Sequence, residues 1–377
     1  MKSELKPADY IRRTTELRRL VDRIRHQSLL AVDTESNSLF AYYERVCLVQ
    51  LSTREQDFIV DPLALDNMNP LGELLADPAV EIVFHAAEYD IITLKRDFKF
   101  TFSHVFDTML AARICGWEKV GLGSILAEQF DILVDKKYQR ADWSERPLPP
   151  SLLLYAQMDT HYLPDLRDRL VSELEKAGRL DEAREIFADL PNLSPAEHHF
   201  DPEGFWRIGQ IQDLKRNQLA LVRELYLLRD ELARRRNTPP FKVFSDQVII
   251  ELARIAPRRL EDLYPIKGLA ASLVRSYGDQ LIQAIGRGRV APVPRPPRLR
   301  QPIDPEVQLR YEALHEWRKA RAVERGVESD VIIPRGTLWA LARRVPKTLE
   351  ELENIPGLGP WRRAEYGAEL LALLHKP

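Results

Sequence analysis

The C-terminal half of the sequence contains one segment twice, at a constant offset of 89 residues. Leu252-Ala253-Arg254 returns as Leu341-Ala342-Arg343, and Gly268-Leu269 returns as Gly357-Leu358. The same offset relates four further matches, namely Pro257 and Pro346, Leu260-Glu261 and Leu349-Glu350, Leu263 and Leu352, and Ile266 and Ile355. A constant offset kept over this many matching positions is typical of a structural repeat in which each copy folds as one unit. The sequence therefore predicts two similar small domains behind a different N-terminal part.

The repeats divide the chain of 377 residues into three expected domains. From Ile208 onward the apolar spacing is helical, broken by turn signals such as Asn237-Thr238-Pro239-Pro240, so each copy is expected to be an all-α bundle. A proline-rich run over 291–302 separates the copies. Its prolines favour an extended, semi-rigid spacer. The expected boundaries are 1–200, 205–290 and 303–377, with 291–302 as a linker.

The first 200 residues have the pattern of an α/β domain. Apolar runs rich in β-branched residues predict strands at 29–32, 46–51, 58–60 and 81–84. Helical periodicity follows at 86–98, 107–114, 124–130 and 150–177. A sheet flanked by helices is the expected fold.

Charge is unevenly distributed, although the net charge is only −2. Residues 1–200 hold 24 Lys and Arg against 34 Asp and Glu, whereas residues 205–300 hold 19 against 9. Residues 301–377 are balanced at 12 against 12. A basic block beside an acidic one indicates a polyanion partner, and a solvated charged surface is the alternative.

Three separated segments carry acidic residues in positions suited to chemistry. Asp33 and Glu35 end the first predicted strand on one face, because strand side chains alternate. Asp90 falls in the first turns of a helix, and Tyr155 and Asp159 share a helix face at i and i+4. Each has a structural alternative: the pair could be a solvated strand edge, and Asp90 could complement the helix dipole.

Taken together, these segments resemble the tyrosine-bearing branch of the DEDD exonuclease superfamily. The motifs Asp-x-Glu, His-Ala-x-x-x-Asp and Tyr-x-x-x-Asp occur in the family's order, at residues 33–35, 85–90 and 155–159. Phe106-Asp107-Thr108 and the segment over 136–148 resemble the ribonuclease D subfamily, and the repeats resemble HRDC domains. The resemblance implies a ribonuclease H-like mixed sheet flanked by helices, followed by two HRDC bundles.

The resemblance also implies a function and a cofactor. The expected activity is 3′→5′ exoribonuclease hydrolysis to 5′-nucleoside monophosphates, on the 3′ ends of tRNA precursors and other small structured RNAs. Two divalent cations, Mg²⁺ or Mn²⁺, are implied, with Asp33 bridging them, Glu35 and Asp159 completing the site of the attacking water, and Asp90 serving the second ion. Tyr155 would orient the nucleophile. The alternatives are a DNA 3′→5′ exonuclease and an RNA-binding scaffold whose site has decayed.

Further residues are expected to contact the substrate. They are His85, Arg140, Trp143, Arg234, Arg235 and Arg236. His85 could equally be a buried histidine whose hydrogen bonds are made within the protein. Trp143 is either a base-stacking platform or a packing anchor. Asp107 starts a helix and is expected to be its N-cap rather than a metal ligand.

The glycine turns of the two repeats differ. Residues 355–359 of the second copy, Ile-Pro-Gly-Leu-Gly, resemble a helix-hairpin-helix turn whose backbone N–H groups can meet a phosphate, whereas the first copy has Ala270 at the second glycine. The second repeat could bind RNA or pack on protein, and both readings stay open. The lack of a long apolar run and of an apolar leader predicts a cytoplasmic protein without a membrane segment, expected to be a monomer.

Overall fold

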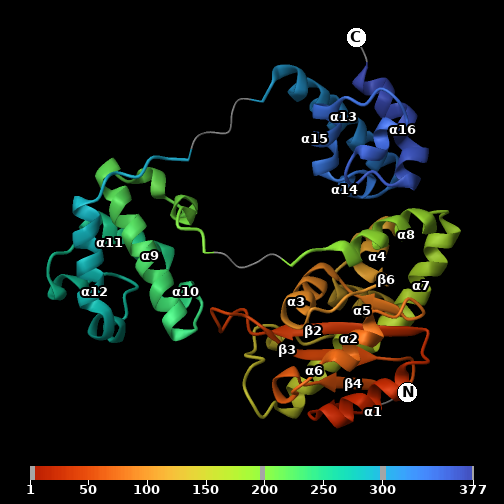
Figure 1. The fold of residues 1–377 in the computed structure, drawn as a ribbon, viewed down its shortest axis with the longest axis horizontal. Helices are drawn as coiled ribbons and strands as arrows, with labels where there is room; N and C mark the ends of the chain where they lie inside the picture. Colours follow the sequence, from red (N-terminus) through yellow and green to blue (C-terminus); the bar gives the residue numbers. More distant parts are fainter. Residues whose placement is uncertain (1–4, 196–199, 298–302, 376–377) are drawn as a thin grey trace. The chain divides into compact units, whose positions relative to one another are not determined.

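The N-terminal domain is built on a six-stranded mixed sheet (Figure 1). The computed structural model describes residues 5–195, 200–297 and 303–375. The strand order is β1-β4-β3-β2-β5-β6, and β3 runs antiparallel to β4, whereas β1 with β4, β2 with β5, and β5 with β6 are parallel pairs. The strands are β1 (Asp9–Ile11), β2 (Leu29–Ser36), β3 (Val46–Ser52), β4 (Asp57–Val60), β5 (Glu81–Phe84) and β6 (Val105–Asp107). The predicted α/β class with a mixed sheet is confirmed.

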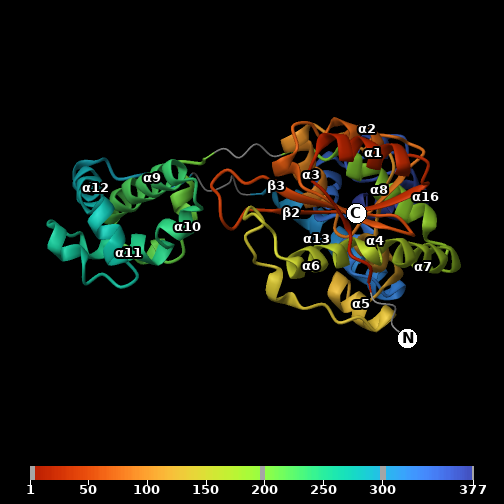
Figure 2. The same cartoon turned by 90° about the horizontal axis from the view of Figure 1, so that it is seen from below.

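Helices cover both faces of this sheet. In Figure 2, α1, α2 and α3 lie on one face, and α6 and α7 lie on the other. The helices are α1 (Thr14–Ile24), α2 (Asn69–Leu75), α3 (Glu88–Phe98), α4 (Thr108–Cys115), α5 (Leu122–Phe130), α6 (Pro150–His161), α7 (Leu163–Lys176) and α8 (Leu180–Asp189). Because it is covered on both sides, β3 is buried along its whole length.

The two repeats have the same helices at the predicted offset. The first contains α9 (Leu219–Arg236), α10 (Pro240–Val243), α11 (Asp246–Ile255) and α12 (Ala271–Val290). The second contains α13 (Pro305–Arg325), α14 (Ser329–Ile332), α15 (Arg335–Arg344) and α16 (Pro360–Leu374). Even the left-handed residue that ends α11, Ala256, has its equivalent in Val345 after α15, both at φ 47°. The predicted all-α repeats are confirmed.

The described residues form two compact units. One contains the sheet domain together with the second repeat, and the other contains the first repeat together with residues 36–45. The last five residues of the predicted linker, 298–302, lie outside the described residues. None of the helices in the described ranges is both long and apolar enough to span a bilayer.

Candidate active site

The end of β2 places two carboxylates and one hydroxyl on alternate sides of the strand. Asp33 and Glu35 are both half-buried, and Thr34 between them is buried. The Thr34 hydroxyl donates a hydrogen bond of 2.5 Å to Oδ1 of Asp90, which is 6% exposed and lies in the first turn of α3. One strand end therefore carries two of the predicted carboxylates and holds the third.

Asp107 fixes the turn that leads into α3. Its carboxylate accepts from the backbone N–H groups of Met109 and Leu110 at 2.8 and 3.0 Å, so the predicted N-cap of α4 is confirmed. The same carboxylate accepts from Ala86 and Ala87 at 3.2 and 2.7 Å. Because Ala86 has a left-handed φ of 64°, this turn needs such support. Asp107 thereby orients the helix that presents Asp90.

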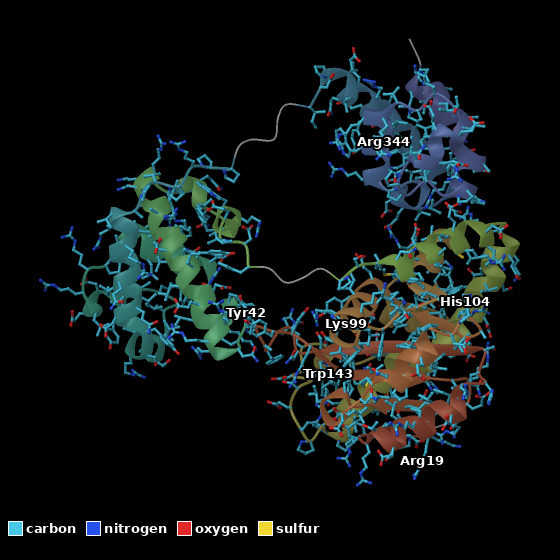
Figure 3. The ribbon with its side chains drawn as sticks, viewed as in Figure 1. Arg19, Tyr42, Lys99, His104, Trp143 and Arg344 are labelled. Carbon is cyan, nitrogen blue, oxygen red and sulfur yellow. The ribbon has the colours of Figure 1, made fainter. Side chains whose placement is uncertain are left out.

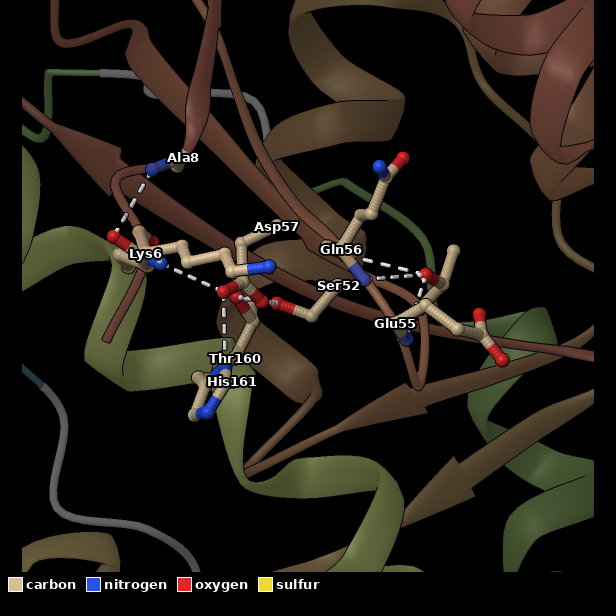
Figure 4. Close-up of polar contacts among 10 residues, drawn as sticks. Lys6, Ala8, Ser52, Glu55, Gln56, Asp57, Thr160 and His161 are labelled. Atoms are coloured by element: carbon tan, nitrogen blue, oxygen red, sulfur yellow. Dashed lines mark hydrogen bonds and ion pairs between the residues drawn. The ribbon is translucent and has the colours of Figure 1, made fainter. Parts of the chain in front are cut away.

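Helix α6 is held against β3 and β4 by a polar network centred on Asp57 (Figure 4). The Asp57 carboxylate accepts from Ser52 Oγ and Gln157 Nε2, and contacts His161 Nδ1 at 2.8 Å. Burial tends to raise the pKa of Asp57, but these hydrogen bonds from His161, Ser52 and Gln157 bring it below its usual value. Thr160 adds a hydroxyl contact of 2.7 Å to Ser52. These side chains anchor the helix that carries Tyr155 and Asp159.

Arg146 fastens the segment before α6 to the sheet. Its guanidinium donates to both oxygens of Asp61 at 2.7 Å each and to the carbonyl of Cys47 at 2.9 Å. It also donates to the carbonyl of Trp143 at 2.7 Å. Tyr10 completes the group by donating to Asp61 at 2.6 Å. A bidentate, partly buried arginine of this kind fixes geometry better than a surface pair.

The ring of Tyr155 lies among aromatic side chains that this segment supplies. Trp143 stacks on it with ring centroids 6.2 Å apart and planes at 30°, and Tyr138 meets it edge-on at 5.8 Å. Trp143, labelled in Figure 3, is only 1% exposed and belongs to an apolar cluster that includes Leu152 and Ala156 of α6. Its burial leaves no face for a nucleobase and favours the packing-anchor reading over base stacking.

The four predicted carboxylates repel one another. Burial raises the pKa of Asp33 well above its usual value, and the charges of Asp90, Asp159 and Glu35 raise it further. Burial and the charges of Asp159 and Asp90 raise the pKa of Glu35 to about 9, and burial and the charge of Asp90 raise that of Asp159 to about 7. Burial also raises the pKa of Asp90 to about 7, against the opposing hydrogen bond from Thr34. The predicted residues of three segments are thus brought within electrostatic range.

Hard oxygen donors of this kind suit Mg²⁺ or Mn²⁺, because a divalent cation offsets the repulsion between carboxylates. Within the described ranges, no three Asp, Glu, His or Cys side chains are arranged so that they could hold a metal ion. The four carboxylates fit divalent cations because their oxygen atoms are suitable ligands and because a bound cation would offset their mutual repulsion.

The predicted substrate-contacting residues differ in their surroundings. His85 is partly buried, contacts Thr108 Oγ1 at 2.9 Å, and has its pKa lowered by burial to about 4, so its imidazole is neutral at pH 7. Arg140 is exposed. Arg234, Arg235 and Arg236 are exposed in the last turn of α9, far along the chain from the carboxylates. The positioning network of Asp57, Asp61 and Arg146 was not predicted.

Comparison with known proteins identifies the family. Residues 9–175 match the 3′-5′ exonuclease family model, and residues 218–285 and 308–374 match the HRDC domain model. Ribonuclease D of Gluconacetobacter diazotrophicus is 31% identical over 371 residues, which cover 96% of this chain and 91% of that protein. The chain belongs to the ribonuclease D family.

Solved structures of two proteins are similar in fold to this ribonuclease D family member. The structure of Escherichia coli RNase D, described as an exoribonuclease involved in structured RNA processing, matches with a TM-score of 0.68 at 25% identity, covering 98% of this chain and 99% of that one. The catalytic core of Trypanosoma brucei RRP6 matches with a TM-score of 0.71 at 28% identity, covering 76% of this chain and 81% of that one. The chain is a 3′→5′ exoribonuclease.

Replacing Trp143 tests whether its indole packs or binds RNA. Trp143→Ala should lower the free energy of unfolding by about 3–5 kcal/mol, as for other buried aromatic side chains, and should lower kcat because Tyr155 loses its stacking partner. Trp143→Phe should keep most of the free energy of unfolding and most of the kcat of the wild type. Urea unfolding and initial rates on a short RNA measure the two effects. An unchanged stability with only a raised KM would make the indole a substrate contact instead.

Proposed function

We propose that this ribonuclease D family member trims the 3′ ends of tRNA precursors and other small structured RNAs by two-cation catalysis. The proposal is supported by the mutual influence of the predicted site residues: in addition to burial, the charges of Asp90, Asp159 and Glu35 raise the pKa of Asp33, and the charges of Asp159, Glu35 and Asp33 raise that of Tyr155. Asp33, Glu35, Asp90 and Asp159 would hold two divalent ions, Mg²⁺ or Mn²⁺. When bound, such ions activate water and stabilise the departing sugar oxyanion beside the phosphate.

The protein's own groups then do the positioning. Burial, followed by the charges of Asp159, Glu35 and Asp33, raises the pKa of Tyr155 above its usual value. Its hydroxyl therefore stays protonated near neutral pH and acts by hydrogen bonding rather than as a general base. Trp143 and Tyr138 fix the ring, while the Asp57 and Asp107 networks fix the helices that present Asp159 and Asp90.

One assay tests the proposal and separates its alternatives. Single-stranded RNA and DNA of the same sequence, each labelled at the 5′ or the 3′ end, are incubated with Mg²⁺, with Mn²⁺ and with chelator. The expected result is immediate release of labelled 5′-nucleoside monophosphate from 3′-labelled RNA, and stepwise shortening of 5′-labelled RNA, both stopped by chelator. Faster cleavage of DNA would favour a DNA exonuclease, and no cleavage under any condition would favour a decayed scaffold.

The first repeat is the proposed RNA-gathering surface. Residues 205–300 carry the excess of Lys and Arg, and Arg234, Arg235 and Arg236 are exposed on it. Arg235 pairs with Glu231 at 2.7 Å, and the guanidinium of Arg236 lies 5.8 Å from the ring of Tyr277. Both contacts are at the surface, where a phosphate can compete with them because such ion pairs are weak.

Replacing these three arginines with alanine should weaken RNA binding in a salt-dependent way. Each lost phosphate contact lowers the log–log salt slope by about 0.7 for single strands, so the full loss is about 2. The matched control is Arg18→Ala with Arg19→Ala, two exposed arginines on α1 of the acidic domain. Fluorescence anisotropy at several salt concentrations measures the slopes. If both variants and the wild type gave the same salt slope, the three arginines would belong to a solvated charged surface that does not bind RNA.

A further inference from the structure

The second repeat contacts α8 through ion pairs that are largely shielded from solvent. Glu182, on α8, is 0% exposed and accepts from Arg325 at the end of α13, with one contact at 3.0 Å and a second, shorter one. Arg325 also donates to Tyr366 at 2.5 Å, and its own carbonyl accepts from Arg179 at 2.9 Å. Glu182 therefore has its partners on the second repeat.

A second contact lies at the glycine turn that precedes α16. The backbone N–H of Trp361, in the first turn of this 15-residue helix, donates to Glu185 Oε2 at 2.5 Å. Glu185 is on α8, and its side chain is 10% exposed. Its other oxygen lies 3.6 Å from the guanidinium of Arg362, which is 4% exposed. A carboxylate thus occupies the position at a helix N-terminus that favours an anion.

Gly359 leaves the space that this carboxylate fills. A Cβ atom at this position would stand 2.2 Å from Cδ and 2.5 Å from Oε2 of Glu185, so a larger residue there would displace the Glu185 carboxylate from the turn. The first repeat has Ala270 at the equivalent position, and Ser272 and Leu273 where the second has Trp361 and Arg362. The features that receive Glu185 thus belong to the second copy and not to the first.

We propose that the glycine turn of the second repeat is a docking site for α8 of the same chain, and that it does not bind an RNA phosphate. Glu185 already accepts the Trp361 N–H that a phosphate would use, and the Arg362 guanidinium donates to the carbonyls of Ile332 and Val331. Glu182 and Arg325 complete the contact, together with Arg113, which donates to Glu328 and to Asp330. The second repeat is therefore a structural part of the exonuclease unit, in keeping with its balanced charge, while the first repeat carries the basic surface.

Hydrogen exchange on the full-length protein tests this assignment. Glu185→Ala should speed exchange of the backbone amides over 359–363 by about tenfold or more, because a charge-assisted hydrogen bond is lost. Glu185→Gln keeps an acceptor oxygen and should therefore give a smaller increase in the exchange rate. This second variant keeps the test valid if alanine disturbs folding. Asp181→Ala is the control, since Asp181 lies on the same helix, is exposed and pairs with Arg184. The turnover of a dinucleotide should be unchanged in all three variants.

The RNA arm of the experiment uses wild-type protein with a saturating single-stranded RNA, in chelator so that the RNA is not hydrolysed. Exchange over 359–363 should stay the same when RNA is added, because Glu185 already occupies the turn. Two results would overturn the proposal. One is unchanged exchange over 359–363 in both Glu185 variants, and the other is RNA-induced protection of these amides in the wild type.

Discussion

Replacing Asp33 with asparagine is expected to abolish measurable hydrolysis. Asp33 is the carboxylate on which the charges of Asp90, Asp159 and Glu35 all act, so it stands at the centre of the proposed cation site. Loss of a ligand that supports several kcal/mol of transition-state stabilisation lowers kcat by about 10³-fold or more. Asp159→Asn should have a similar effect. Initial rates on 3′-labelled RNA with saturating Mg²⁺ measure the loss.

The fold should tolerate Asp33→Asn, so the loss of activity can be distinguished from a loss of stability. Since the folded-state pKa values of Asp90 and Asp159 are raised to about 7, the metal-free fold loses stability as pH rises from the unfolded value near 4 through about 7. Removing the charge of Asp33 relieves this repulsion. In chelator, Asp33→Asn should therefore melt above the wild type at pH 8, and the difference should shrink at pH 5. Wild-type turnover in Asp33→Asn would contradict the assignment.

Replacing Tyr155 with phenylalanine should reduce kcat by about 10²-fold, at the low end of the effect of a positioned proton donor or acceptor. Only the hydroxyl is removed, and the ring keeps its contacts with Trp143 and Tyr138. Mn²⁺ binding should be unchanged, because no carboxylate is lost. Full rate profiles against RNA concentration measure kcat and KM separately. An unchanged kcat with a raised KM would make Tyr155 a substrate contact.

Regular elements were predictable from local patterns, and short or interrupted ones were not. The buried apolar runs predicted β2 to β5, but β1 and β6 are only three residues long and give too little alternation to recognise. The pattern over 150–177 predicted helix, yet the structure divides it at Tyr162, before Pro164, into α6 and α7. Proline in the first turn begins a helix more readily than it continues one.

The candidate site shows the same division between local and long-range information. The carboxylates and Tyr155 could be selected because strand and helix periods place them on shared faces. By contrast, the contact between Arg146 and Asp61 joins residues 85 apart, and that between Arg325 and Glu182 joins residues 143 apart. Such pairs leave no periodic signal in one sequence. For the same reason, burial of Trp143 could not be told from stacking on a base, and the sequence left open whether the second repeat binds RNA or packs on protein.

The docking contact also determines how the RNA-binding surface should be tested. Deleting both repeats would expose Glu182 and Glu185 together with the apolar surface around them. A loss of activity could then come from weaker RNA binding or from a less stable exonuclease domain, and the experiment would not separate the two. The arginine substitutions on α9 leave α8 intact. They therefore isolate the contribution of the first repeat.

The number of Mn²⁺ ions bound per chain tests the central assignment most directly. Free Mn²⁺ is counted by electron paramagnetic resonance during a titration of wild-type and Asp33→Asn protein, each with a 5′-nucleoside monophosphate present. Two bound ions per wild-type chain and at most one per Asp33→Asn chain are expected, because the proposed assignment has Asp33 bridging both ions. Equal binding by the two proteins, or no binding by the wild type, would contradict it.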